Sequence, residues 1–325
     1  MSKTFTDLVR HALNGPTMGT RWSALFHMPH GFDVAPVAAA MQAAVDEVDA
    51  QMSMWKPDSD LMRLNAAAQD VWVDVPPRLM TVLAAALEIG RASDGAFDIG
   101  MGDAVAAWGF GPAQANEAAI RAALTCARRP AHKLLELDVS KGRARKHGPL
   151  TLDLSGIAKR YGVDRLAEVA GTYGITGALL AIDGELRAIG LQPDGTPWTV
   201  AIERPDHGER VPHSIIALQD AAIATSGDYR HWVQAGTRKL SHTMDPARGG
   251  PVAAPPASVT VVAQTCMAAD AWATALMVTG RMKGATLARR YNLGALFIDR
   301  EGGHLREEHV GRLFHTGQRS IKQTT

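Results

Sequence analysis

The fold of this chain is organised around one stretch, Met267-Ala268-Ala269-Asp270-Ala271-Trp272-Ala273-Thr274-Ala275-Leu276-Met277-Val278-Thr279-Gly280. Ala, Leu and Met dominate it and no proline interrupts it, which predicts a helix. Asp270 and Thr274 are four residues apart, so their side chains project from one face of that helix. They are almost the only polar side chains in an apolar segment, and burying them without partners would cost several kcal/mol.

Two interpretations of this pair stay open as long as only the helix is considered. A hard cation with oxygen ligands would satisfy the carboxylate and the hydroxyl together. Alternatively, Asp270 caps the start of the helix and Thr274 donates a hydrogen bond back to the preceding turn. The choice between a cation site and a helix cap depends on residues elsewhere in the chain.

The composition is typical of a globular protein with a sizeable core. The chain has 325 residues, 46% of them hydrophobic, which suits one large domain or two packed ones. A net charge of +1 without a Lys/Arg run argues against a nucleic-acid or membrane surface. Two cysteines, Cys126 and Cys266, argue against a disulfide framework. Residues 1–20 contain no apolar run of signal-peptide length and nothing later approaches a membrane span. We therefore expect a soluble, cytoplasmic protein, unless a leader was removed.

Hydrophobic periodicity predicts a mixture of helices and antiparallel strands. Helices are expected at residues 35–51, 59–65, 77–92, 115–126, 267–280 and 282–291. Strands are expected at residues 21–28, 178–183, 185–191, 198–203, 214–219, 258–263 and 295–299, with a strand and hairpin at 133–143. Short connections at Gly184 and Asp194-Gly195 favour meanders over crossovers. Residues 222–230 are expected to form an edge or a turn.

The sequence pattern of residues 150–164 predicts a strand that runs directly into a helix. Small residues at Ser155-Gly156 let the backbone approach a ligand, and the free N–H groups of a helix start favour an anion. Lys159 follows within one turn and could reach a phosphate. The alternative is a solvated lysine on an amphipathic helix, which is the commoner fate of a single Lys.

A set of short motifs carries the strongest functional signal. In chain order they are Met18-Gly19-Thr20, Ser53-x-Trp55 with Ser59 and Leu64-Asn65, Gly95-Ala96-Phe97-Asp98, Asp153-Leu-Ser-Gly156-Ile-Ala-Lys159, Ser226-Gly227, His242-x-x-Asp245-Pro246 and Ala-Asp270-x-x-x-Thr274. Each motif is weak alone, but in this order, from about residue 17 to 298, the chain resembles the ApbE family. This family comprises the FAD:protein FMN transferases, formerly called thiamine biosynthesis lipoproteins. The resemblance favours the cation site over the helix cap.

The resemblance implies cleavage of the FAD pyrophosphate and transfer of FMN to a Thr or Ser hydroxyl of a partner flavoprotein, with release of AMP. It also implies a divalent cation, Mg²⁺ or else Mn²⁺, held by the Asp270 carboxylate, the Thr274 hydroxyl and the main-chain carbonyl of Gly156. Mg²⁺ commonly combines a few such oxygen donors with substrate phosphates. Asp153 and Lys159 would line the FAD site, with Lys159 near the phosphates as a catalytic residue.

The remaining site residues follow from the same resemblance. The aromatic parts of the nucleotide are expected to contact Met18, Trp55 and the turn formed by Ala96, Phe97 and Asp98. Trp55 stands where many relatives have Tyr, and either ring can stack.

His242 is the candidate general base toward the acceptor hydroxyl, a role that suits an imidazole at neutral pH. The alternative is a loop histidine bonded to Asp245 or to the backbone. Ser226 is expected to face the substrate rather than to act as a nucleophile, because the sequence positions no base beside it.

The chain also departs from the family pattern. Arg160 follows Lys159 where the family usually has Gly, and its side chain either points to solvent or adds positive charge near the phosphates. There is no lipobox and no flavinylation acceptor motif of the type Asp-x-x-(Ser/Thr)-Gly-Ala-(Ser/Thr), so self-modification is not expected. Two alternative functions are an FAD pyrophosphatase, in which water replaces the hydroxyl, and an accessory protein that binds FAD without turnover.

The implied fold is α+β, ApbE-like and related to the T-fold, with antiparallel sheets flanked by helices. The flavin site is expected between two intimately packed subdomains. The expected organisation is a polar N-terminal arm at residues 1–16, the ApbE-like transferase domain at 17–300 and a charged tail at 301–325.

Overall fold

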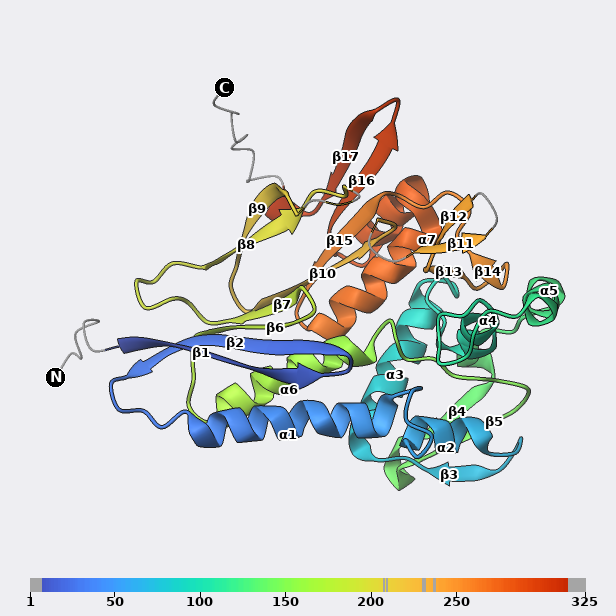
Figure 1. Ribbon diagram of the computed structural model, residues 1–325, viewed down its shortest axis with the longest axis horizontal. Coiled ribbons are helices and arrows are strands. Elements are labelled where there is room, and N and C mark those ends of the chain that lie inside the picture. Colours follow the sequence, from blue (N-terminus) through green and yellow to red (C-terminus); the bar gives the residue numbers. More distant parts are fainter. Residues whose placement is uncertain (1–7, 207, 209, 230–231, 236–237, 315–325) are drawn as a thin grey trace.

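The structure is a computed structural model that describes residues 8–206, 208, 210–229, 232–235 and 238–314 (Figure 1). Its main feature is an eight-stranded sheet in which every neighbouring pair is antiparallel. In spatial order the strands are β1 (Leu8–Thr17), β2 (Thr20–Pro29), β6 (Ala178–Ile182), β7 (Glu185–Ile189), β10 (Ala221–Gly227), β15 (Ser258–Ala263), β16 (Gly294–Glu301) and β17 (His304–Val310).

Helices cover one face of this sheet and a hairpin covers part of the other (Figure 1). Buried residues of α1 (Ala35–Met52) and α6 (Ala158–Thr172) form one core cluster with β2 and β6, and α7 (Cys266–Arg290) packs on β10 and β15. The hairpin of β8 (Trp198–Glu203) and β9 (Pro212–Leu218) contributes its alternating buried side chains to a second cluster. Both faces of the central strands therefore contribute side chains to the core.

A smaller unit lies beside the helical face (Figure 1). It consists of α2 (Asp60–Ala66), α3 (Pro77–Ala92), α4 (Gly102–Ala107) and α5 (Glu117–Thr125), together with β3 (Trp72–Asp74), β4 (Leu135–Asp138) and β5 (Arg143–Lys146). Buried residues of α3 share the largest core cluster with α7. Two further short hairpins, β11 (Trp232–Ala235) with β12 (Arg238–Ser241) and β13 (Met244–Asp245) with β14 (Gly250–Pro251), complete the order of elements. The predicted α+β class with antiparallel sheets and flanking helices is confirmed.

Residues 8–16, which the sequence analysis placed in a polar N-terminal arm at residues 1–16, form most of β1, and residues 1–7 lie outside the described part of the chain. This strand pairs with β2 along its full length, from Leu8 opposite Pro29 to Thr17 opposite Thr20. Met18 and Gly19 link the two strands with φ of 42° and 74°, as a two-residue hairpin turn with positive φ at both positions requires. Gly15 and Pro16 have low β propensity, so propensity alone does not predict this strand. At the other end, β17 likewise lies within the segment predicted as a charged tail.

Two other predicted elements differ from the structure. Residues 151–154 form no strand; instead, the Asn65 side chain accepts from Leu152 N at 2.8 Å and donates to Leu152 O at 2.9 Å. An amide side chain thus supplies the hydrogen bonds that a neighbouring strand would provide. Residues 222–230 were expected at an edge or turn, whereas β10 is a central strand between β7 and β15. Its small residues fit beneath α7.

Helix α7 confirms the stretch from which the sequence analysis began. Its backbone departs from helical geometry at Gly280, with φ of 72° and ψ of 169°, which separates the two predicted helices. Within the described residues, none of the helices combines the length and the apolar character needed to cross a membrane.

The start of α7 is held by a buried carboxylate from α6. Asp164 accepts from Cys266 N and Met267 N, both at 2.9 Å, and from Arg187 Nη1 at 2.6 Å. Burial raises the pKa of Asp164 while these donors oppose the shift. The contact fixes α7 relative to α6 and β7, the elements that carry most of the charged residues described below.

We expect Asp164→Ala to lower the free energy of unfolding by about 3 kcal/mol, because it leaves two backbone donors and a guanidinium without their shared acceptor. Chemical denaturation measures this value. Thr265, whose side chain accepts from Ala268 N at 3.2 Å, is the matched control at the same helix end. Its replacement by Ala should cost only about 1 kcal/mol. Equal losses in both variants would contradict the special role of Asp164.

Candidate active site

A cavity of about 1170 Å³ opens between the eight-stranded sheet and the smaller helical unit. The β6–β7 turn, β10, the start of α6 and one face of α7 contribute its polar wall, and residues 96–101 contribute an apolar one. Most of the predicted site residues line it: Ala96, Phe97, Asp98, Asp153, Gly156, Lys159, Ser226, His242, Asp270 and Thr274. The structure thus brings together side chains that are up to 178 positions apart in sequence, from Ala96 to Thr274.

Asp270 and Thr274 both face this cavity from α7. Asp270 is only 5% exposed, and its Oδ2 accepts no hydrogen bond from any residue that the structure describes. It is not a helix cap, because Thr265 is the N-cap residue of α7. Thr274 Oγ1 lies 3.3 Å from Ser226 Oγ on β10. The pair is therefore presented to the cavity, as the cation interpretation requires.

Gly156 lies beside Thr274, the second member of this pair. A Cβ atom on Gly156 would be 3.8 Å from Thr274 Oγ1 and 3.4 Å from Phe97 Cε2, which is ordinary contact for a methyl group but leaves no room for more. The main chain at residue 156 thereby approaches the Thr274 hydroxyl closely. Three of the oxygen donors expected around a cation thus come from two neighbouring segments.

We expect Gly156→Val to lower the FMN transfer that the resemblance implies by about 10²-fold or more, because a branched side chain would enter the space between Phe97 and Thr274. Gly156→Ala is the matched control and should keep activity within a few-fold. Single-turnover transfer rates measure both variants. Strong inhibition by the alanine variant, or none by valine, would show that the space beside Thr274 is not limiting.

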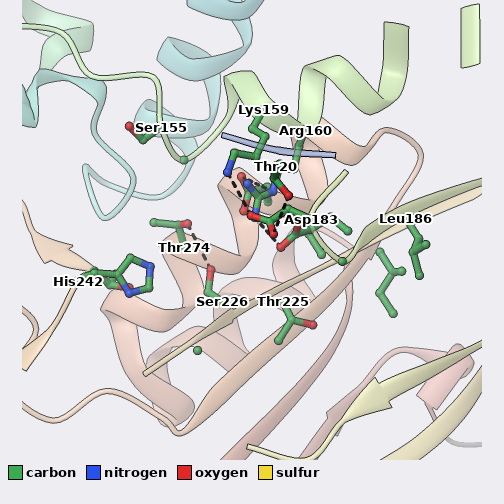
Figure 2. A pocket seen from close by; sticks show the side chains of 18 of the residues that line it. Thr20, Ser155, Lys159, Arg160, Asp183, Leu186, Thr225, Ser226, His242 and Thr274 are labelled. Carbon is green, nitrogen blue, oxygen red and sulfur yellow. Dashed lines mark hydrogen bonds and ion pairs between the residues drawn. The ribbon is translucent and has the colours of Figure 1, made fainter. Parts of the chain in front are cut away.

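The start of α6 supplies positive charge to the cavity. Lys159 forms an ion pair of 3.1 Å with Asp183, and the α6 N-terminus has no side-chain cap within the described part of the chain. A helix start without a side-chain cap and a lysine at the same end favour an anionic ligand. Figure 2 shows Lys159, Arg160 and Asp183 on one side of the cavity, with His242 on the other and Thr274 and Ser226 between them.

The structure shows the direction of the Arg160 side chain, which the sequence left open. Its side chain is not directed to solvent but is buried beside the polar wall, with Nη2 at 2.5 Å from Glu185 Oε1 and Nε at 3.4 Å from Asp270 Oδ2. Burial raises the pKa of Asp270 and the charge of Glu185 adds to this, while Arg160 opposes the shift. The arginine therefore adds positive charge next to the carboxylate of α7.

Asp98 and Asp153 hold the shape of the cavity wall. Asp98 accepts from Gly100 N at 2.8 Å and Ala131 N at 3.0 Å, and Asp153 accepts from Ser155 N at 2.6 Å and Ser155 Oγ at 2.5 Å. Burial raises the pKa of both carboxyls, although these donors favour the charged form. Their first task is to fix the turns on which Phe97 and Gly156 lie.

His242 is half-buried on the cavity wall, and Figure 2 shows its ring turned toward the region of Ser226 and Thr274. Two predicted contact residues lie apart from the main cavity. The Trp55 side chain is 67% exposed in the loop between α1 and α2, and Met18 lines a smaller neighbouring hollow with Gln42 and Asp46. Thr20 lines both spaces, so the hollow adjoins the main cavity.

The sequence analysis missed Asp183 and Glu185 as site residues. Asp183 and Gly184 form the β6–β7 turn with φ of 56° and 98°, and an Asp-Gly pair between apolar strands is a strong hairpin signal. The signal identifies the turn, but nothing in it indicates that the turn borders the cavity.

Comparison with known proteins identifies the family of this chain. The family model described as "ApbE family" matches residues 18–297. This chain belongs to the ApbE family. An FAD:protein FMN transferase of Vibrio cholerae is 36% identical over 288 residues, covering 88% of this chain and 86% of the relative. The enzyme of the same name from Escherichia coli K12 is 33% identical over 303 residues, covering 89% and 84%.

Solved ApbE structures share the fold as well. The flavin transferase ApbE from Vibrio cholerae superposes with a TM-score of 0.83 at 34% identity, covering 95% of this chain and 99% of that one. The apo form of the flavinyl transferase ApbE from Pseudomonas stutzeri superposes with a TM-score of 0.82 at 32% identity, covering 95% and 96%. The predicted family and the ApbE-like fold are therefore confirmed.

Proposed function

We propose that this ApbE protein is an FAD:protein FMN transferase that binds Mg²⁺ at Asp270, Thr274 and Gly156 and transfers FMN to a Thr or Ser hydroxyl of a partner flavoprotein. The observation that carries the proposal is the cavity wall on which a buried carboxylate, a hydroxyl and a close main-chain segment lie beside the cationic start of α6. These are the groups that phosphoryl transfer needs, because its catalysis rests on positioning and charge neutralisation.

The residues present fit a hard, oxygen-preferring cation such as Mg²⁺ better than a metal that prefers nitrogen or sulfur ligands. No cluster of three or more His, Cys, Asp or Glu side chains suited to a metal occurs in the described part of the chain. Asp270 Oδ2 is buried and accepts no hydrogen bond there, so the position offers a hard, incompletely used oxygen donor. When bound, Mg²⁺ would neutralise charge on the pyrophosphate oxygens. Mn²⁺ has the same ligand preference and would serve in its place.

The protein side chains have distinct tasks in this proposal. Lys159 and the backbone donors at the α6 start bind the pyrophosphate of FAD, and residues 96–98 contact the nucleotide. His242 accepts the proton of the acceptor hydroxyl as its oxygen forms a bond to the phosphorus of the FMN moiety. The bond between that phosphorus and the bridging oxygen breaks, and the oxygen leaves with AMP.

The partner is a protein whose acceptor hydroxyl can enter the cavity beside His242. A cytoplasmic location stays a prediction, supported by two unpaired cysteines, the exposed Cys126 and the buried Cys266.

Mass spectrometry tests the proposal after incubation of the protein with FAD, Mg²⁺ and a domain that carries the flavinylation motif. The expected result is a Mg²⁺-dependent FMN adduct on the domain with release of AMP. AMP and free FMN without an adduct would support the pyrophosphatase alternative instead. FAD that stays bound and intact in the presence of Mg²⁺ would support the accessory-protein alternative.

A further inference from the structure

Three charged side chains meet at the candidate metal site, and one of them is the proposed ligand Asp270. Arg160 comes from α6, Glu185 from the start of β7 and Asp270 from α7, and their side chains are only 15%, 9% and 7% exposed. The neighbouring ion pair of Lys159 and Asp183 lies closer to solvent, with 26% and 43% exposure. The three buried groups therefore interact in a poorly solvated place, where charges influence one another strongly.

The two contacts of Arg160 are unequal. Its Nη2 lies 2.5 Å from Glu185 Oε1, the distance of a strong charge-assisted hydrogen bond. Its Nε lies 3.4 Å from Asp270 Oδ2, and neither of these two atoms has a hydrogen-bond partner among the described residues. Glu185 thus anchors the guanidinium, while Asp270 is held only by charge.

The unequal contacts of Arg160 affect any cation that binds at Asp270. One guanidinium and two carboxylates leave one negative charge in the cluster, which attracts a divalent ion. The guanidinium of Arg160, however, lies next to the Asp270 carboxylate that would bind this divalent ion. A free Arg160 would close onto Asp270, and the contact with Glu185 keeps it back.

We propose that Arg160 is a resident counter-ion of Asp270 that competes with the divalent cation, and that Glu185 sets the strength of this competition by anchoring the guanidinium. The inference rests on the metal site of the proposed function and deepens it. It assigns Arg160 and Glu185 as positioning residues that determine metal affinity, without direct contact to the metal.

The test measures Mn²⁺ binding to the full chain without FAD, by the EPR signal of free Mn²⁺. Arg160→Gln keeps a hydrogen-bond donor for Glu185 but removes the charge, so the Kd for Mn²⁺ should fall about tenfold. Glu185→Gln releases the guanidinium toward Asp270 and removes a negative charge, so the Kd should rise about tenfold. Arg160→Lys retains the charge and should stay within about threefold of the parent protein.

Opposite changes in the Kd for Mn²⁺ in Arg160→Gln and Glu185→Gln distinguish this role from a merely structural one, since simple damage to the fold would weaken binding in both variants. Thermal melts of the metal-free variants identify any that unfold, and Glu185→Gln tests the idea independently if Arg160→Gln does not fold. Asp270→Asn gives the background level of Mn²⁺ binding for a protein without the proposed metal site. If the parent protein binds Mn²⁺ no better than Asp270→Asn, the proposed metal site falls and this inference with it. If the parent protein binds but the Arg160 and Glu185 variants match it, only this inference is overturned.

Discussion

Replacing Asp270 by Asn should lower FMN transfer by about 10³-fold or more while the protein stays folded. Losing the proposed charged ligand would remove charge neutralisation at the pyrophosphate, and several kcal/mol of transition-state stabilisation correspond to this factor. The fold should survive because Arg160 keeps its 2.5 Å contact with Glu185 and is not left as an unpaired buried cation. Single-turnover kinetics with FAD and an acceptor domain measure the rate, and circular dichroism measures the fold.

The control for this variant is Asp138→Asn. Asp138 lies at the end of β4, pairs with Arg143 at 3.1 Å and does not line the cavity. Its replacement should leave the transfer rate within about twofold, because it alters a carboxylate remote from the reacting groups. Transfer by Asp270→Asn at the rate of the parent protein would remove Asp270 from the metal site.

Replacing His242 by Ala should lower the rate of FMN transfer by about 10²- to 10³-fold and change the Kd for FAD by less than about threefold. A general base contributes in this range to the chemical step. It contributes little to substrate affinity, because the proton moves only in the transition state. Rapid-quench transfer assays and fluorescence titration of FAD separate the two quantities.

His147→Ala is the matched control for this variant. His147 contacts Asp70 and Glu136 at 2.9 and 2.7 Å and lies outside the cavity, so transfer should be unchanged. A His242→Ala variant that transfers FMN normally would refute the assignment. A variant that loses FAD binding in parallel with transfer would indicate a binding residue instead.

The helices could be predicted well because each carries its own pattern. Residues 35–51 and 77–92 were predicted as helices, and the structure gives α1 (Ala35–Met52) and α3 (Pro77–Ala92). Both present an apolar stripe at helical spacing, which depends only on residues within one segment. The strands β1 and β10 were harder, because their pairing partners and not their own composition keep them in the sheet.

The site residues likewise divide into those that the sequence predicted and those that only the structure revealed. The order of its motifs was visible in the chain, so Asp270, Thr274, Gly156, Lys159 and His242 were named from the sequence, and all of them line one cavity. Asp183 and Glu185 carry no motif, and they reach this cavity only because the β6–β7 turn points to the start of α6. Trp55 belonged to a motif, yet its side chain lies in an exposed loop.

The sequence by itself determined the family, the fold class and the helix face on which Asp270 and Thr274 lie, since all of these depend on local spacing and on the order of motifs. Only the tertiary structure decided where Arg160 points. The packing of α6 against β7 and α7 places its guanidinium between Glu185 and Asp270, at 2.5 and 3.4 Å. Residues 25 or more positions apart share no local pattern, so the balance of charge at the candidate metal site exists only once these three elements have packed together.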